Sequence, residues 1–204
     1  MIFHHSFALG KRLLTNSTVG RRKISGQIFF DLRGEIDPEW VFIDGSYVRA
    51  HQHASGARLG EERAIGVSRG GPTTKLHFAA DSHGNPIDFE ITGGEVHDSQ
   101  VAGKIIDKVG SDAMNIVADK GYDSDEIRVL VWARGGCPVI PRRSNSKKDN
   151  LGFDPHIYRH RHLVENLFAK LKHYRGIATR FDKLARNFKA MVFIACSIIW
   201  IKLK

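Results

Sequence analysis

The chain has 204 residues and a net charge of +9, with 42% hydrophobic and 26% charged residues. This composition is ordinary for a globular protein and excludes a fibrous or wholly disordered one. The most apolar stretch, Ala190–Ile201, is shorter than the roughly twenty residues of a membrane-spanning helix. The two cysteines have neither disulfide-framework nor zinc-ligand spacing, so we expect a cytoplasmic protein with no membrane contact.

The positive charge is concentrated in one segment. Between Arg142 and Lys189 there are 13 Lys and Arg residues and 4 Asp and Glu residues, whereas the rest of the chain has 18 of each. A surplus confined to one segment is typical of a surface that binds a polyanion, and nucleic acid is the usual one. The alternative is a solvated basic surface that only aids solubility.

The N-terminal part has the weakest structural signals. Residues 1–27 lack clear periodicity and are predicted to be poorly ordered, so a single folded domain is expected over residues 28–204. Ile28–Leu32 is a short apolar segment, and Asp37-Pro38 is a signal for a turn or a helix start.

The remainder alternates between strand and helix patterns. Ala54–Gly71 is glycine-rich and predicted to be an exposed loop, and Asp81–Pro86 is predicted to be a hairpin turn. The predicted strands are Trp40–Val48, Thr73–Ala80, Ile87–Ile91, Asn115–Ala118 and Pro138–Ile140. The predicted helices are Asp98–Val109, Ser124–Arg134, Asp154–Tyr174 and Asp182–Leu203. This order predicts an α/β fold with a mixed five-stranded sheet flanked by helices, and it fits a ribonuclease-H-like architecture.

Two aspartates occupy unusual positions in the predicted strands. Asp44 follows the apolar run Val41–Ile43, and Asp119 follows Ile116–Ala118. A carboxylate in such a place is costly to bury unless it is paired or bound to metal. The carboxyl end of a sheet strand is also where sites usually lie in α/β proteins. The alternative for both residues is turn formation, because a glycine follows each of them closely.

The predicted helix from Asp154 to Tyr174 carries a polar stripe beside its apolar face. At about 100° per residue, Tyr158, Arg161, Glu165 and Lys172 fall within a stripe about 60° wide. The alternative is an ordinary amphipathic helix with surface ion pairs, since Arg161 and Glu165 have i,i+4 spacing.

Three isolated carboxylates on two strands and one helix form a coherent chemical set. Magnesium prefers oxygen ligands, usually a few carboxylates together with water and substrate phosphates. Two such ions about 4 Å apart activate a water and stabilise the leaving oxygen of a phosphodiester. Basic side chains on the same helix would hold the phosphates.

These residues lie in motifs that resemble those of insertion-sequence transposases of the IS5 type, in the DDE superfamily. Ile43–Gln52 (IDGSYVRAHQ) resembles the first-aspartate motif, and Ala118–Asp123 (ADKGYD) resembles the second. Arg69–His77 (RGGPTTKLH) and Gly94–Ser99 (GEVHDS) match intervening blocks. The spacing Tyr158-x2-Arg161-x3-Glu165-x6-Lys172 matches the glutamate signature.

The resemblance implies a fold, a reaction and roles for individual residues. It implies a ribonuclease-H-like domain in which Asp44, Asp119 and Glu165 are the catalytic residues and bind two Mg²⁺ ions, for which Mn²⁺ can substitute. It further implies cleavage of double-stranded DNA at the terminal inverted repeats and strand transfer into target DNA, by a homo-oligomer assembled on DNA. The implied DNA contacts are Tyr158, Arg161 and Lys172, with Lys120 and His97 at the rim.

One departure from the family pattern leaves a second interpretation open. Only 43 residues precede Asp44, whereas family members commonly carry a longer helical segment there that helps to bind DNA. The chain is therefore interpreted as a second-frame or N-terminally shortened product, and one interpretation is that it is inactive without an upstream segment. The alternatives are a DNA-binding remnant or regulator of a decayed element, and a nuclease of the same fold without strand joining.

Overall fold

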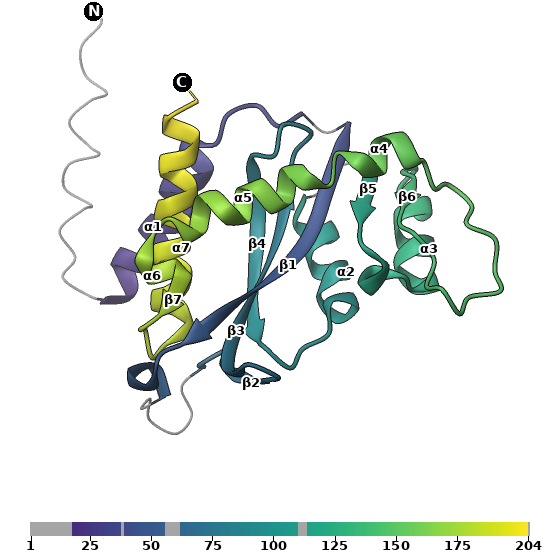
Figure 1. Ribbon diagram of the computed structural model, residues 1–204. Helices are drawn as coiled ribbons and strands as arrows, with labels where there is room; N and C mark the ends of the chain where they lie inside the picture. The colour runs from purple at the N-terminus through teal and green to yellow at the C-terminus, as the bar shows by residue number, and fades with distance from the viewer. Residues whose placement is uncertain (1–17, 38, 56–61, 110–113, 204) are drawn as a thin grey trace, which may run out of the picture.

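The computed structural model describes residues 18–37, 39–55, 62–109 and 114–203. A mixed sheet forms its centre, with helices on both faces (Figure 1). The strands are β1 Trp40–Ala50, β2 Gly66–Ser68, β3 Gly71–Ala80, β4 Pro86–Gly93, β5 Asn115–Ala118, β6 Pro138–Val139 and β7 Thr179–Arg180. The α-helices are α1 Thr18–Leu32, α2 Asp98–Val109, α3 Asp125–Ala133, α4 Pro155–Arg159, α5 His162–Lys172, α6 Arg175–Ala178 and α7 Ala185–Ile201. Two 3₁₀ turns, η1 Gln52–Ser55 and η2 Lys120–Tyr122, complete the set.

The sheet combines an antiparallel and a parallel half. Its order is β2-β3-β1-β5-β6, with β4 paired to β3 and β7 paired to β1. β1, β3 and β4 are antiparallel neighbours, whereas β5 and β7 run parallel to β1. The predicted mixed α/β sheet is confirmed, and the two strands that were not predicted, β2 and β7, are only three and two residues long.

Each face of the sheet buries its own hydrophobic core. Helices α1, α5, α6 and α7 cover one face, where Phe42, Phe78 and Val117 project from the strands. Helices α2 and α3 cover the other face, where Val41, Ile43 and Ala118 project. The alternation of side chains along β1 thus places residues 42 and 44 on the face that α5 covers.

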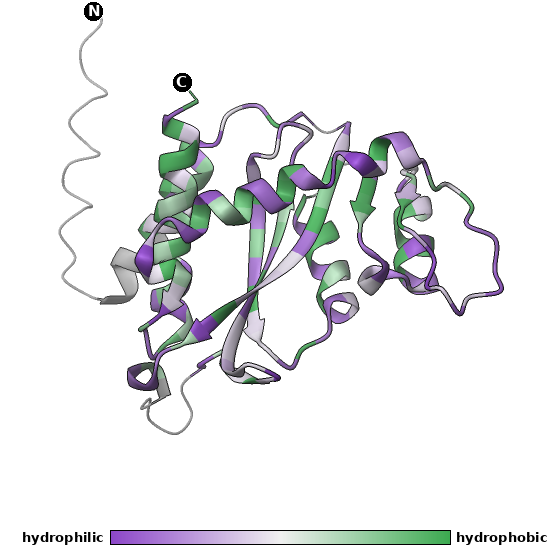
Figure 2. Ribbon diagram, viewed as in Figure 1, coloured by the Kyte–Doolittle hydropathy of each residue, from purple (hydrophilic) through white to green (hydrophobic). Residues whose placement is uncertain are grey.

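Helix α7 explains the most apolar stretch of the sequence. Its residues are mostly hydrophobic (Figure 2), and Phe188, Val192 and Cys196 are fully buried against the sheet. None of the helices in the described residues is both long enough and apolar enough to cross a membrane.

Helix α1 differs from the prediction for the N-terminal segment. Residues 18–27, which were expected to be poorly ordered, are helical, while the rest of that segment lies outside the described residues. The helix has no marked amphipathic pattern, and it packs on α7 through Phe29 and Phe30, whose ring centroids lie 5.5 and 6.0 Å from that of Phe193. Its order therefore comes from tertiary contacts that no local pattern reveals.

The predicted helix Asp154–Tyr174 consists of two helices joined by a tighter turn. Around the junction, the N–H groups of His160, Arg161, Leu163 and Val164 donate to carbonyls three residues back. These are 3₁₀-type bonds, which interrupt the α-helical pattern without turning the chain away. The stacking of the His160 ring on Trp40, with centroids 5.3 Å apart, accompanies this junction.

Candidate active site

The sheet register places the two predicted aspartates side by side. β1 and β5 are parallel, and Ile43 pairs with Ala118 at the end of their ladder. Asp44 and Asp119 are the next residues on each strand, so their backbones lie about one strand spacing, roughly 4.8 Å, apart. Asp119 caps the η2 turn, and its Oδ1 accepts a 2.8 Å hydrogen bond from the Gly121 N–H.

The edge of β1 is open where Asp44 lies. β5 pairs with β1 only up to Ile43, and β7 begins to pair at Arg49. Within the described residues, the segment between them has a strand neighbour only in β3. Helix α5 crosses β1 on this face (Figure 1), and its Lys172 Nζ donates a 2.7 Å hydrogen bond to Ser46 Oγ.

Arg161 joins the third acid to the first. Its Nη1 lies 2.9 Å from Asp44 Oδ2 and its Nη2 lies 2.5 Å from Glu165 Oε1. Both carboxylates therefore contact the same guanidinium, although they are 121 residues apart in the sequence. The Asp44 side chain is 17% exposed and the Glu165 side chain 53%, so the glutamate faces solvent at the mouth of the site.

The charge on Asp44 is unfavourable in this arrangement. The pKa of the Asp44 carboxyl is raised to about 6, mainly by burial and also by the nearby Asp119 and Asp98 carboxylates, although the Gly45 N–H and Arg161 act to lower it. A cation held between these acids would offset both the free-energy cost of burying the Asp44 charge and the repulsion between the carboxylates.

A second polar cluster lies directly behind Asp44, on the opposite face of β1. Lys75 Nζ contacts Asp98 Oδ2 at 2.6 Å, and His77 Nδ1 lies 3.3 Å from Asp98 Oδ1. Lys75 and His77 are buried, at 4% and 0% exposure. A Cβ atom at Gly45 would come within 2.4 Å of Asp98 Oδ1, so glycine leaves the space that this carboxylate occupies.

Sequence reasoning missed this cluster as part of the site. The signal was present, because β3 carries Thr73, Lys75 and His77 at alternate positions, which places three polar side chains on one face of the strand. Asp98 was predicted only as the beginning of a helix, which it is.

The other residues that were predicted to contact DNA are spread over α4, η2 and the segment before α2. Tyr158, on α4, precedes the junction and packs on Phe153 with ring centroids 5.3 Å apart. Lys120 is exposed in η2 immediately after Asp119. His97 is exposed beside α2, where its Nδ1 lies 2.8 Å from Ser99 Oγ, and no described contact links it to the three acids.

Several basic residues of the segment 142–189 make contacts that stabilise the fold. Arg180 is fully buried and donates to several backbone carbonyls. Arg142 and Lys148 pair with acids of the Asp123–Asp125 segment, and Lys189 lies 3.6 Å from Glu90. The exposed cations that remain include Arg143, Lys147, Arg159, Lys170, Lys172 and Arg175.

The donor set suits a hard divalent cation. Within the described ranges, no three His, Cys, Asp or Glu side chains already surround a common point at metal-ligand distances. Instead, the Arg161 guanidinium lies between Asp44 and Glu165. All-oxygen donors next to a repelling acid pair nevertheless match the preference of Mg²⁺ or Mn²⁺.

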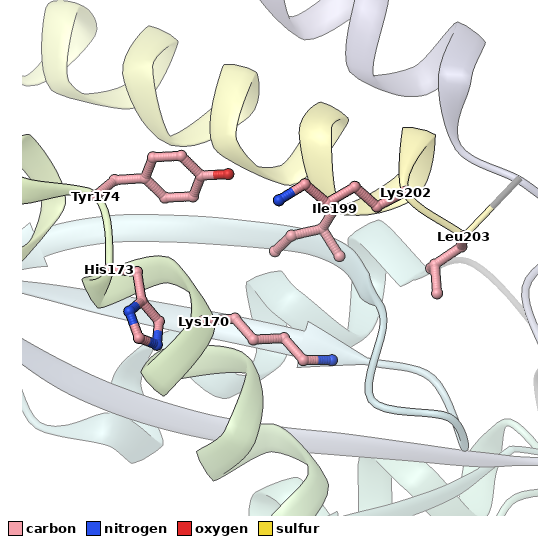
Figure 3. Close-up of a pocket in the computed structure, with 6 residues that line it drawn as sticks. All are labelled: Lys170, His173, Tyr174, Ile199, Lys202 and Leu203. Atoms are coloured by element: carbon pink, nitrogen blue, oxygen red, sulfur yellow. The ribbon is translucent and has the colours of Figure 1, made fainter.

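A cavity of about 440 Å³ lies elsewhere, between the ends of α5 and α7 (Figure 3). It is lined by Lys170, His173, Tyr174, Ile199, Lys202 and Leu203, and none of the three acids reaches it.

Comparison with known proteins identifies the family of the chain. Residues 36–200 match the family model described as the transposase DDE domain. A Brucella ovis protein assigned as a transposase for insertion sequence element IS6501 is 33% identical over 134 residues, 64% of this chain and 99% of that protein. A Burkholderia cepacia protein assigned likewise for IS402 is 30% identical over 143 residues, 65% of each chain.

The fold is also shared with a solved transposase structure. The cryo-EM structure of the piggyBac transposase synaptic complex with hairpin DNA superposes with a TM-score of 0.50 at 12% identity. The match covers 80% of this chain and 47% of that chain, so this chain spans about half of that transposase. The resemblance shows the ribonuclease-H-like architecture of the core.

Proposed function

The chain belongs to the transposase DDE domain family, and from this premise we propose that it cuts and joins DNA at the ends of an insertion sequence. Asp44, Asp119 and Glu165 are the proposed acidic triad. The observation that supports the proposal is that Arg161 contacts both Asp44 and Glu165, while the register of β1 and β5 sets Asp119 beside Asp44.

The proposed triad would hold the two divalent cations that this superfamily uses. Asp44 and Asp119 would bind from the adjacent strands, and Glu165 would close the site from α5. Bound Mg²⁺ would lower the pKa of a water and stabilise the leaving 3′ oxygen. For Glu165 to turn inward, Arg161 must release at least one carboxylate, and its guanidinium then becomes available to a DNA phosphate.

Other side chains of the chain would position the DNA. Lys172 is held over β1 by Ser46, next to the open edge, where its ammonium can contact a phosphate. Tyr158 and Lys120 flank the carboxylates on either side, and His97 is a weaker candidate. The proposed partners are double-stranded terminal repeats and target DNA, bound by a homo-oligomer.

A cleavage assay separates the candidate functions. End-labelled duplexes containing an end of the element are incubated with the chain and Mg²⁺, with Glu165→Gln as control. Nicks together with joined products support the transposase. Nicks without joined products indicate a nuclease, and end binding without cleavage indicates a DNA-binding remnant.

DNA binding is predicted to depend steeply on salt. Each phosphate neutralised contributes about −0.9 to the slope of log K against log salt, so four or more contacts lower affinity at least about 100-fold between 50 and 200 mM. In fluorescence anisotropy, Arg159→Gln/Lys170→Gln is expected to flatten the slope by one to two. The control Lys104→Gln/Lys202→Gln removes two exposed charges outside residues 142–189 and should retain the slope. Equal slopes for the two double variants would contradict this assignment.

A further inference from the structure

A groove lies at the C-terminal end of β1. Its volume is about 770 Å³, and it is formed by the end of β1, the β2–β3 turn and the segment that follows β4. Its lining residues include Tyr47, Arg49, Ser68, Arg69, Thr73 and Glu95. None of the residues proposed for catalysis or DNA contact lines it.

Tyr47 presents an aromatic ring that is fixed in place. The residue is 49% exposed, and Lys75 Nζ lies 4.7 Å from the centroid of its ring. Lys75 is itself held by Asp98 at 2.6 Å. An exposed ring supported by a buried cation loses little conformational freedom when a flat ligand stacks on it.

Two arginines supply positive charge beside this ring. Arg49 and Arg69 are both exposed. Among the described residues, neither guanidinium has a carboxylate within ion-pair distance. Glu95 is the one acid of the lining, and its carboxylate lies over the backbone of Gly66, where a Cβ would be 1.2 Å from Oε2. The groove thus offers two available cations to a ligand with repeated negative charge.

The position of the groove relates it to the carboxylates. Tyr47 is three residues beyond Asp44 on the same strand, about 10 Å along it, and its side chain projects from the opposite face of β1, where Lys75 lies. Between these residues β1 has β3 on one edge and no strand on the other, within the described part of the chain. A chain of phosphates that reaches Asp44 can therefore continue around this edge into the groove.

We propose that this groove binds an unpaired stretch of the DNA strand that flanks the scissile phosphate, an inference that rests on the proposed function. Tyr47 stacks on one exposed base, and Arg49 and Arg69 contact successive phosphates. An unpaired strand is required because the face of a base is accessible to a ring only when that base has left the helical stack.

The test compares two DNA probes without divalent cations, so that no cleavage occurs. One is a blunt fluorescent duplex containing an element end, and the other adds a short unpaired oligothymidine extension on the flank. Wild type is expected to bind the extended duplex about tenfold more tightly. Tyr47→Leu should reduce this preference to within about twofold, whereas Tyr47→Phe should retain it because the ring remains.

The arginines are tested with the same probes. Arg49→Gln/Arg69→Gln is expected to weaken binding of the extended duplex more than that of the blunt one, and Lys104→Gln/Lys202→Gln should affect both equally. A wild type without preference for the extension, or a preference that survives Tyr47→Leu, overturns the proposal. If the chain cleaves DNA in Mg²⁺ but does not prefer the extended duplex, the proposal for the groove is refuted and the proposed function is not. If the chain prefers the extended duplex but does not cleave, the proposal for the groove is supported and the proposed function is refuted.

Discussion

Asp44→Asn is expected to lower the rate of DNA cleavage at least about 1,000-fold, equivalent to roughly 4 kcal/mol of transition-state stabilisation. Asparagine has nearly the same shape but no charge, so it cannot hold a divalent cation beside Asp119. DNA binding should change little, because the exposed cations that contact phosphates are untouched. The measurement is single-turnover cleavage of an end-labelled duplex, with affinity measured in parallel by anisotropy.

The matched control is Asp31→Asn, which makes the same change at an exposed position on α1. It should cleave at the wild-type rate. If Asp44→Asn lost binding and cleavage together and also melted at a lower temperature, the carboxylate would have a structural role instead.

Arg180→Lys is expected to destabilise the fold by about 4 kcal/mol, a loss as large as that caused by truncating a large buried side chain. The buried guanidinium donates to the carbonyl oxygens of Arg63, Ala64 and Asp182, at 2.6, 3.0 and 2.9 Å, and to Thr74 Oγ1 at 2.5 Å. Burial lowers the pKa of Arg180 to about 10, so the guanidinium stays charged at neutral pH and its buried N–H groups depend on these acceptors. A lysine ammonium cannot reach a fork of four acceptors.

Chemical denaturation measures the change in free energy of unfolding. Arg175→Lys, at an exposed position in α6, is the control and should be neutral to within about 0.5 kcal/mol. A similarly small effect for Arg180→Lys would show that the loop at residues 62–66 does not depend on this residue.

The strands and helices that bear the acids were predictable because their signals are local. The apolar runs before Asp44 and Asp119 mark two strands that are parallel neighbours in the sheet, and the predicted bounds of α2 match the structure. The ion pair between Arg161 and Glu165 matches the alternative interpretation of the predicted helix Asp154–Tyr174, in which their i,i+4 spacing forms a surface ion pair.

Other features could not be read from the sequence because they depend on long-range contacts. Arg180 counts as one more basic residue in a basic segment, yet β3 and residues 62–66 surround it. The contact between Arg161 and Asp44 spans 117 residues. The cluster of Asp98, Lys75 and His77 forms only when α2 packs behind β1, so no local periodicity reveals it.

The central claim is that divalent cations bind between Asp44, Asp119 and Glu165. Crystals grown with Mn²⁺ and a DNA end, measured at the manganese absorption edge, locate the metal by anomalous scattering. We predict one or two peaks within about 2.5 Å of carboxylate oxygens of Asp44 and Asp119, with Glu165 turned inward and Arg161 displaced toward a phosphate. Peaks only at other acids, or none at saturating Mn²⁺ with Arg161 still bridging Asp44 and Glu165, would contradict the account.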